Sequence, residues 1–127
     1  MAENTQTHVL VSAIERAIGQ DDPYVEGLQA SWEELGFDAD LRLFEFHDVW
    51  LDHCVLRELH ARKASFDECD LTRADLFRTP LRGVDLSSCN IAGISVSDTR
   101  EELRGLVIGV EQAQDLVGML GVRMVDV

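Results

Sequence analysis

The sequence predicts a solenoid, a fold built by stacking a short repeat, and three observations support this prediction. Every fifth residue from Leu41 to Val96 is apolar. A second series, two positions before each of these, is mostly small and, apart from Thr79, apolar. The positions between the two series are mostly charged, polar or glycine. An α-helix repeats every ~3.6 residues and a strand every ~2, so a strict period of five indicates a stacked repeat.

The clearest repeats lie between Cys69 and Gly93 and read CDLTR, ADLFR, TPLRG, VDLSS and CNIAG. They resemble the pentapeptide-repeat family, whose consensus is A(D/N)Lxx. The resemblance covers residues 39–98 as twelve units, and before Ala64 it keeps the spacing but loses the Asp or Asn. It implies an all-β solenoid, a right-handed quadrilateral β-helix. One unit forms each side and four units each coil, so we expect about three coils in a central domain over 39–98.

The coil arrangement can be examined in the sequence, because residues 20 apart should stack at a spacing of about 4.8 Å. Phe46, Phe66 and Leu86 then form one interior column, and all three cysteines face inward. Stacked Cys69 and Cys89 lie within reach of a disulfide, which would make them a redox pair. We favour the alternative that each cysteine fills a narrow core as a small apolar residue. An odd number of cysteines without CxxC spacing indicates neither a disulfide framework nor a zinc site.

Residues 1–38 have helical spacing and predict a helical hairpin that caps the solenoid. One helix carries apolar residues from Leu10 to Ile18 on one face and ends at Gly19. A second starts at Asp22-Pro23 and repeats apolar residues at 3-4-3 spacing as far as Leu35. A solenoid end exposes backbone and core side chains, so we favour a cap over the alternative, an arm that recruits a partner.

Residues 99–127 predict a strand over 103–108, a helix over 111–120 and a second strand over 122–127. This order resembles the C-terminal module of the quinolone-resistance pentapeptide proteins, which forms a two-fold dimer in those relatives. The resemblance implies a homodimer here, with residues 99–127 as a capping and dimerisation module. The alternative is that the apolar residues of this module only cap the last coil, and the two interpretations are compatible. The predicted dimer interface consists of Leu116, Met119, Leu120, Val122 and Met124.

The sequence contains no arrangement typical of an enzyme, and we expect neither a cofactor nor a metal. Its four histidines are scattered, and the common nucleotide-binding, zinc-protease and serine-hydrolase motifs are absent. Asp70, Asp75 and Asp85 invite an acid–base interpretation. However, Asp belongs to the repeat at this position, where we expect it to point outward and to turn a corner of the coil.

The formal net charge of −13 excludes ordinary nucleic-acid binding through a basic surface and disfavours anionic membranes. The acidity is uneven: residues 1–38 carry −7, residues 39–98 carry −4 and residues 99–127 carry −2. One side of the predicted solenoid stacks basic residues, and the adjacent side forms an acidic strip. These candidate partner surfaces are Arg42, Arg62, Lys63 and Arg82 on the first side and Glu45, Asp48, Asp67, Glu68 and Asp85 on the second.

Two functions follow from these patterns. The first is a small, non-enzymatic, dimeric scaffold that binds an unidentified protein. The second, implied by the resemblance, is a DNA mimic that occupies the DNA site of gyrase or topoisomerase IV and alters sensitivity to a drug or toxin. Neither a secretory signal nor an apolar run approaching 18 residues is present, so we expect a cytoplasmic protein.

Overall fold

The computed structural model describes residues 9–35, 39–122 and 125. A helix, α1 (Val9–Gly19), precedes three short strands, β1 (Tyr24–Glu26), β2 (Glu45–His47) and β3 (Ser65–Asp67). After a long segment of turns come the 3-10 helices η2 (Glu101–Leu103) and η3 (Val110–Gln112), the helix α2 (Ala113–Val117) and the 3-10 helix η4 (Gly118–Leu120).

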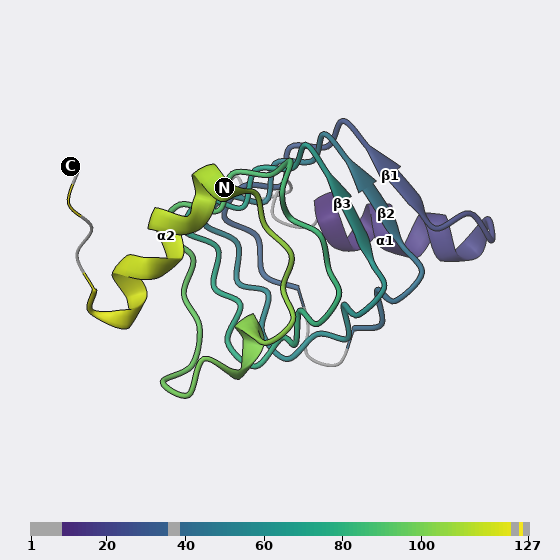
Figure 1. Ribbon diagram of the computed structural model, residues 1–127. Coiled ribbons are helices and arrows are strands. Elements are labelled where there is room, and N and C mark those ends of the chain that lie inside the picture. Colours follow the sequence, from purple (N-terminus) through teal and green to yellow (C-terminus); the bar gives the residue numbers. More distant parts are fainter. Residues whose placement is uncertain (1–8, 36–38, 123–124, 126–127) are drawn as a thin grey trace, which may run out of the picture.

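The strands form one parallel sheet in the order β1-β2-β3, in which Phe46 pairs with Phe66 on the following turn. Single parallel bridges continue this stacking on the other sides, and one column runs from Gln29 through Trp50 and Asp70 to Asn90. Figure 1 shows the chain winding in successive turns along one axis, with α1 beside β1 and α2 at the opposite end. The protein is therefore a β-helix-like solenoid, and it advances about 20 residues per turn through its middle.

Both five-residue series point into the solenoid, as the sequence predicted. Nearly all of their members are buried, and Phe66, Ala39 and Val96 are partly buried against the same core. Phe46 and Phe66 stack with their ring centroids 5.1 Å apart, which confirms the predicted column. Burying one such side chain stabilises the fold by about 1.5–3 kcal/mol, so this continuous core is what holds strands of three residues together.

The Asp and Asn residues of the repeat turn the corners. Asp70 Oδ1 accepts a hydrogen bond from the Thr72 backbone N–H at 2.9 Å, and Asp85 Oδ1 accepts one from the Ser87 N–H at 2.9 Å. The residue after the first of these turns, Arg73, has a φ of 58°, in the left-handed region. The Asp side chain thus accepts the hydrogen bond of a backbone N–H group at the point where the chain turns the corner. The structural interpretation of these carboxylates is confirmed.

The helix expected over residues 22–35 is wrong, because these residues form another turn of the solenoid. Val25 of β1 pairs with Phe46, and Val25, Ala30 and Leu35 are buried with the same period of five. The next member of the series is Leu41, six residues after Leu35 instead of five. This one-residue insertion shifts the phase, so a search that counts in fives from Leu41 does not find the earlier turn. Trp32, assigned to the expected helix face, is 71% exposed.

The expected first helix is present as α1, and it lies over the β1 end of the solenoid. Its Leu10 and Ile14 line the same interior space as Leu35 and leave a cavity of only about 20 Å³. Glu33, which is 3% exposed, accepts hydrogen bonds from the backbone N–H groups of Val9 at 3.0 Å and Leu10 at 2.8 Å. These N–H groups have no partner within the helix, so a carboxylate from the solenoid satisfies them.

At the opposite end the helical segment is present, but the strands that should flank it differ from expectation. Residues 103–108 do not form a continuous strand: η2 ends at Leu103, and a single bridge joins Asp85 to Val107. Of the expected second strand, only Val122 and Val125 are among the described residues, and neither is part of a strand. This region instead continues the stack through isolated hydrogen bonds, such as that from the Gly83 N–H to the Gly105 oxygen and that from the Val107 N–H to the Val84 oxygen.

Gln112 closes the last turn. Its side-chain Nε2 donates to the backbone oxygens of Leu86 at 2.8 Å and Cys89 at 2.7 Å, and its Oε1 accepts from the Gly109 N–H at 2.6 Å. The Leu86 oxygen also accepts a hydrogen bond from the Cys89 N–H at 3.0 Å. A side-chain amide from the helical segment therefore binds the backbone of the last turn and covers this end of the solenoid.

Thr79 is the polar member of the two inward-facing series, and its hydroxyl is satisfied by two hydrogen bonds. The Thr79 hydroxyl donates to the Leu56 oxygen at 2.6 Å and accepts from the Leu59 N–H at 3.1 Å. It thus bridges two backbone groups of the turn before, at 1% exposure.

Candidate interaction surfaces

Basic side chains form a column on one side of the solenoid. Arg42, Arg62 and Arg82 occupy equivalent, exposed positions on successive turns, as the sequence predicted. Lys63 is also exposed and follows Arg62 at a corner, with a φ of 72°. The structure adds a fourth member, Arg104, from the segment that the sequence assigned to the C-terminal module.

Arg104 joins the column because the solenoid continues past the expected boundary. The Gly83 N–H donates to the Gly105 oxygen at 2.8 Å, which stacks the two LRG tripeptides that end at these glycines. A Cβ on Gly105 would lie 3.0 Å from Cγ of Arg82, so glycine leaves the room in which the Arg82 side chain lies. The repeated LRG tripeptide is the sequence signal that could have predicted this fourth arginine. It was missed because the tripeptide recurs after 22 residues, whereas one turn of the repeat has 20.

The four arginines differ in their ionic partners. Arg42 contacts both carboxylate oxygens of Asp40, at 2.8 and 2.7 Å, and this guanidinium holds the pKa of Asp40 well below its usual range. Arg104 lies 3.8 Å from Glu101. Within the described part of the chain, neither Arg62 nor Arg82 forms an ion pair or a side-chain hydrogen bond.

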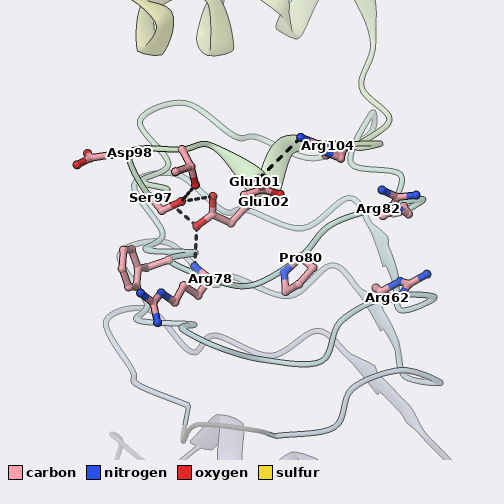
Figure 2. Close-up of a pocket in the computed structure, with 11 residues that line it drawn as sticks. Arg62, Arg78, Pro80, Arg82, Ser97, Asp98, Glu101, Glu102 and Arg104 are labelled. Atoms are coloured by element: carbon pink, nitrogen blue, oxygen red, sulfur yellow. Dashed lines mark hydrogen bonds and ion pairs between the residues drawn. The ribbon is translucent and has the colours of Figure 1, made fainter.

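Three members of the arginine column, Arg62, Arg82 and Arg104, border a groove of about 600 Å³. Figure 2 shows Arg62 and Arg82 on one side of it, Arg78 on the other and Pro80 between them. Phe77 also lines the groove, and the guanidinium of Arg78 lies 5.2 Å from the centre of its ring. We call this feature the arginine groove. Its lining residues are Arg62, Phe77, Arg78, Pro80, Arg82, Ser97, Asp98, Thr99, Glu101, Glu102 and Arg104.

Glu102 forms one wall of the groove from inside the protein, at 1% exposure. It accepts hydrogen bonds from the Arg78 N–H at 2.6 Å, the Ser97 N–H at 2.9 Å and the Ser97 hydroxyl at 2.9 Å. Burial acts to raise the pKa of Glu102, but these hydrogen bonds outweigh it and the pKa is lowered. Its charge is therefore already neutralised by fixed donors, and of the lining carboxylates only Asp98 and Glu101 are exposed.

The acidic strip lies on the sheet side of the solenoid, and one of its carboxylates contacts a histidine. Glu45, Asp67 and Asp85 border one shallow depression of this face. Asp67 Oδ2 lies 2.8 Å from Nδ1 of His47 on the neighbouring strand. The two remaining members are corner residues with positive φ, 56° for Asp48 and 54° for Glu68.

The C-terminal apolar residues divide into two groups. Leu116 and Met119 are partly buried and pack against the core, so they hold the helical segment on the solenoid. Leu120 and Val122 are each 55% exposed. Met124, the fifth residue of the predicted interface, lies outside the described residues.

An exposed aromatic pair was missed by the sequence analysis. Trp32 stacks on His53 of the next turn, with ring centroids 4.0 Å apart and planes 10° apart. Asp52 contacts His53 Nδ1 at 3.2 Å and accepts from the Ser31 hydroxyl at 2.5 Å. Burial raises the pKa of Asp52, but these hydrogen bonds outweigh it and the pKa is lowered. The pair was missed because residues 22–35 were assigned to a helix, and Trp32 was therefore not placed on a turn next to that of His53.

The three cysteines are free and buried. Burial raises the pKa of Cys54 to about 11, and a hydrogen bond with Cys89 together with burial raises the pKa of Cys69. The hydrogen bond with Cys69 outweighs burial at Cys89 and lowers the pKa of that thiol. The thiols of Cys54 and Cys69, whose pKa values are raised, are protonated at neutral pH and react slowly. The arrangement favours the packing interpretation over the redox pair.

Among residues 9–35, 39–122 and 125, no cluster of three His, Cys, Asp or Glu side chains is suited to hold a metal ion. Over the same residues, no helix is long and apolar enough to span a bilayer.

The comparisons with known proteins agree with the stacking. The family described as pentapeptide repeats matches residues 45–76, with eight copies of the repeat. No curated protein matches the chain. These residues contribute two of the three strands and the corners between them. The period, the inward-facing series, the Asx corners and the family match together show that residues 45–76 are similar to the pentapeptide-repeat family.

Proposed function

We propose that this chain is a non-enzymatic interaction scaffold that works as a homodimer. Pentapeptide-repeat proteins are generally structural or interaction proteins, which supports the scaffold. The observation that carries the dimer is the exposure of Leu120 and Val122 beside Leu116 and Met119, which are anchored on the core. A row of apolar side chains that continues from the core into solvent is typical of an interface.

A two-fold arrangement closes such an assembly, because each copy then buries the same patch of the other. A head-to-tail contact would leave one patch free and extend into a fibre. We therefore propose that Leu120 and Val122 lie near the two-fold axis, with Met124 beside them. In this proposal the rod is a right-handed quadrilateral β-helix whose free end is covered by α1.

Sedimentation equilibrium tests the dimer. The wild type should sediment at twice the chain mass of 14.2 kDa. Leu120→Asp should sediment as one chain, because two buried carboxylates would face each other at the axis. Ile18→Asp is the matched control, since Ile18 is 62% exposed at the opposite end of the solenoid, and it should remain a dimer. A wild type that sediments as one chain at tens of micromolar would refute the dimer.

A DNA mimic directed at gyrase or topoisomerase IV is the second candidate, and the acidic strip favours it. Glu45, Asp67 and Asp85 present carboxylates on one flat face, although His47 pairs with one of them. A mimic should inhibit supercoiling by purified gyrase, and Glu45→Lys with Asp85→Lys should abolish the inhibition. Unchanged supercoiling at an excess of the wild-type protein would exclude this candidate and leave the scaffold unaffected.

A further inference from the structure

We propose that the arginine groove binds an acidic helical segment of a partner protein, lying along the solenoid axis with its carboxylates on Arg62, Arg82 and Arg104. This inference rests on the proposed scaffold function and names the chemistry of its partner. The first support is charge: four arginines border the groove, and Arg62 and Arg82 have no ionic partner in the described part of the chain. Arginines are suited to this role because the guanidinium pairs with a carboxylate through two hydrogen bonds.

The groove also differs from a purely ionic surface. Pro80 lies between Arg78 and Arg82 in Figure 2, and Phe77 adds a second apolar side chain to the lining of the groove. The buried carboxylate of Glu102 is occupied by three hydrogen bonds and does not compete for the arginines. Of the two exposed carboxylates that line the groove, Glu101 lies 3.8 Å from Arg104, and Asp98 lies at the far side in Figure 2. Arg78 lies 4.0 Å from Glu58. A ligand can therefore displace a weak contact and reach two unpaired guanidinium groups.

The spacing of the arginines favours a helix over an extended peptide. Successive turns of the solenoid lie about 4.8 Å apart, so Arg62 and Arg104 are separated by about 9.6 Å along the axis. Acidic residues at i, i+3 and i+7 of an α-helix share one face at rises of about 4.5 and 10.5 Å. Side chains on one face of an extended strand repeat every ~6.7 Å and reach ~13 Å after two steps, which is out of register.

The net charge of −13 opposes an acidic ligand at long range. At physiological ionic strength, charges in solvent are screened beyond about 8 Å. The arginines therefore act at contact distance, and we expect measurable binding at 150 mM salt. Neither α1 nor α2, the two α-helices of the described residues, carries acidic residues at i, i+3 and i+7, which favours a segment of another protein as the occupant.

The test uses two fluorescein-labelled, alanine- and glutamine-based helical peptides of identical composition. One has Glu at i, i+3 and i+7, and the other has Glu at i, i+5 and i+10, which distributes the charges around the helix. Fluorescence anisotropy with the wild-type protein at 150 mM salt should show at least about ten-fold tighter binding of the first peptide. Arg62→Glu with Arg82→Glu should remove this preference, and Arg62→Gln with Arg82→Gln should reduce it. Arg16→Glu, which makes half this charge change on the exposed surface of α1, should leave it unchanged.

Three results would overturn the inference: equal binding of the two peptides, no binding of either at 1 mM, or equally tight binding of a 20-base-pair duplex DNA, which would indicate a general polyanion surface. A melting curve establishes that each variant folds. Sedimentation of the same samples separates this inference from the dimer. A dimeric protein without peptide preference would refute the groove alone, and a monomer that keeps the preference would refute the dimer alone.

Discussion

Replacing Glu102 by the uncharged glutamine should destabilise the protein, although the side chain keeps its volume. The carboxylate accepts from two backbone N–H groups, those of Arg78 and Ser97, and from the Ser97 hydroxyl. Glu102→Gln keeps the volume and one acceptor oxygen but replaces charge-assisted hydrogen bonds by neutral ones. Bonds to a charged group contribute about 1.5–3 kcal/mol and neutral ones about 0.5–1.5 kcal/mol. For the two backbone donors the loss is about 2 kcal/mol, or roughly 6–10 °C in melting temperature for a chain of this size.

The effect should depend on pH in a defined direction. The folded protein lowers the pKa of Glu102 below its ordinary value of 4.5, because the hydrogen bonds outweigh burial. A carboxyl with a lowered pKa contributes stability that is present above the unfolded pKa and is lost as the pH falls through the folded pKa. The free-energy difference between the wild type and Glu102→Gln should therefore be full at pH 7 and should shrink below about pH 4.5.

Urea denaturation followed by the fluorescence of Trp32 and Trp50 measures this difference at pH 7 and at pH 3. Glu101→Gln is the matched control, because the Glu101 side chain is 67% exposed and only 3.8 Å from Arg104. It should change the free energy of unfolding by less than about 0.5 kcal/mol. If Glu102→Gln were as stable as this control at pH 7, the hydrogen bonds assigned to Glu102 would not hold the last turn.

The remaining predictions concern the core and the N-terminal end. Thr79→Val should cost about 1–3 kcal/mol, because it leaves the buried Leu59 N–H without a partner, whereas Thr79→Ser should recover part of this loss in urea denaturation. A thiol reagent should label none of the three cysteines in the native protein and all three after denaturation without reductant; two missing thiols would instead favour the redox pair. Glu33→Ala should destabilise the protein by about 1–3 kcal/mol and lower the helical circular dichroism signal, because the first N–H groups of α1 lose their acceptor. An unchanged signal would indicate that α1 is held by its apolar face alone.

The period of five predicted the middle of the solenoid because the repeat itself is a physical constraint. Every inward position must suit a narrow core, so the apolar series can be read without knowing any contact. The same regularity placed Arg42, Arg62 and Arg82 in one column. It failed wherever the count shifts: one extra residue before Leu41 concealed the turn of residues 24–35, and the 22-residue spacing to Arg104 concealed the fourth arginine.

The end closures could not be predicted, because they depend on single long-range contacts. Glu33 and Glu102 are ordinary acidic residues in the sequence, and both become buried acceptors for backbone N–H groups far along the chain. Gln112 belongs to a helical pattern that was predicted, but its amide reaches backbone oxygens of the preceding turn. The Trp32–His53 pair likewise exists only because two turns stack. Such contacts follow from the assembled fold and leave no periodic signal.

Cysteine cross-linking tests the central proposal, a scaffold that pairs through its C-terminal end, most directly. A residue near a two-fold axis meets its own copy, so Leu120→Cys should form a covalent dimer when oxidised with copper phenanthroline. The native cysteines are at most 7% exposed and should not compete. Ile18→Cys, 62% exposed at the opposite end, is the control and should stay monomeric on a denaturing gel. Equal cross-linking of the two variants, or none with Leu120→Cys, would contradict the dimer.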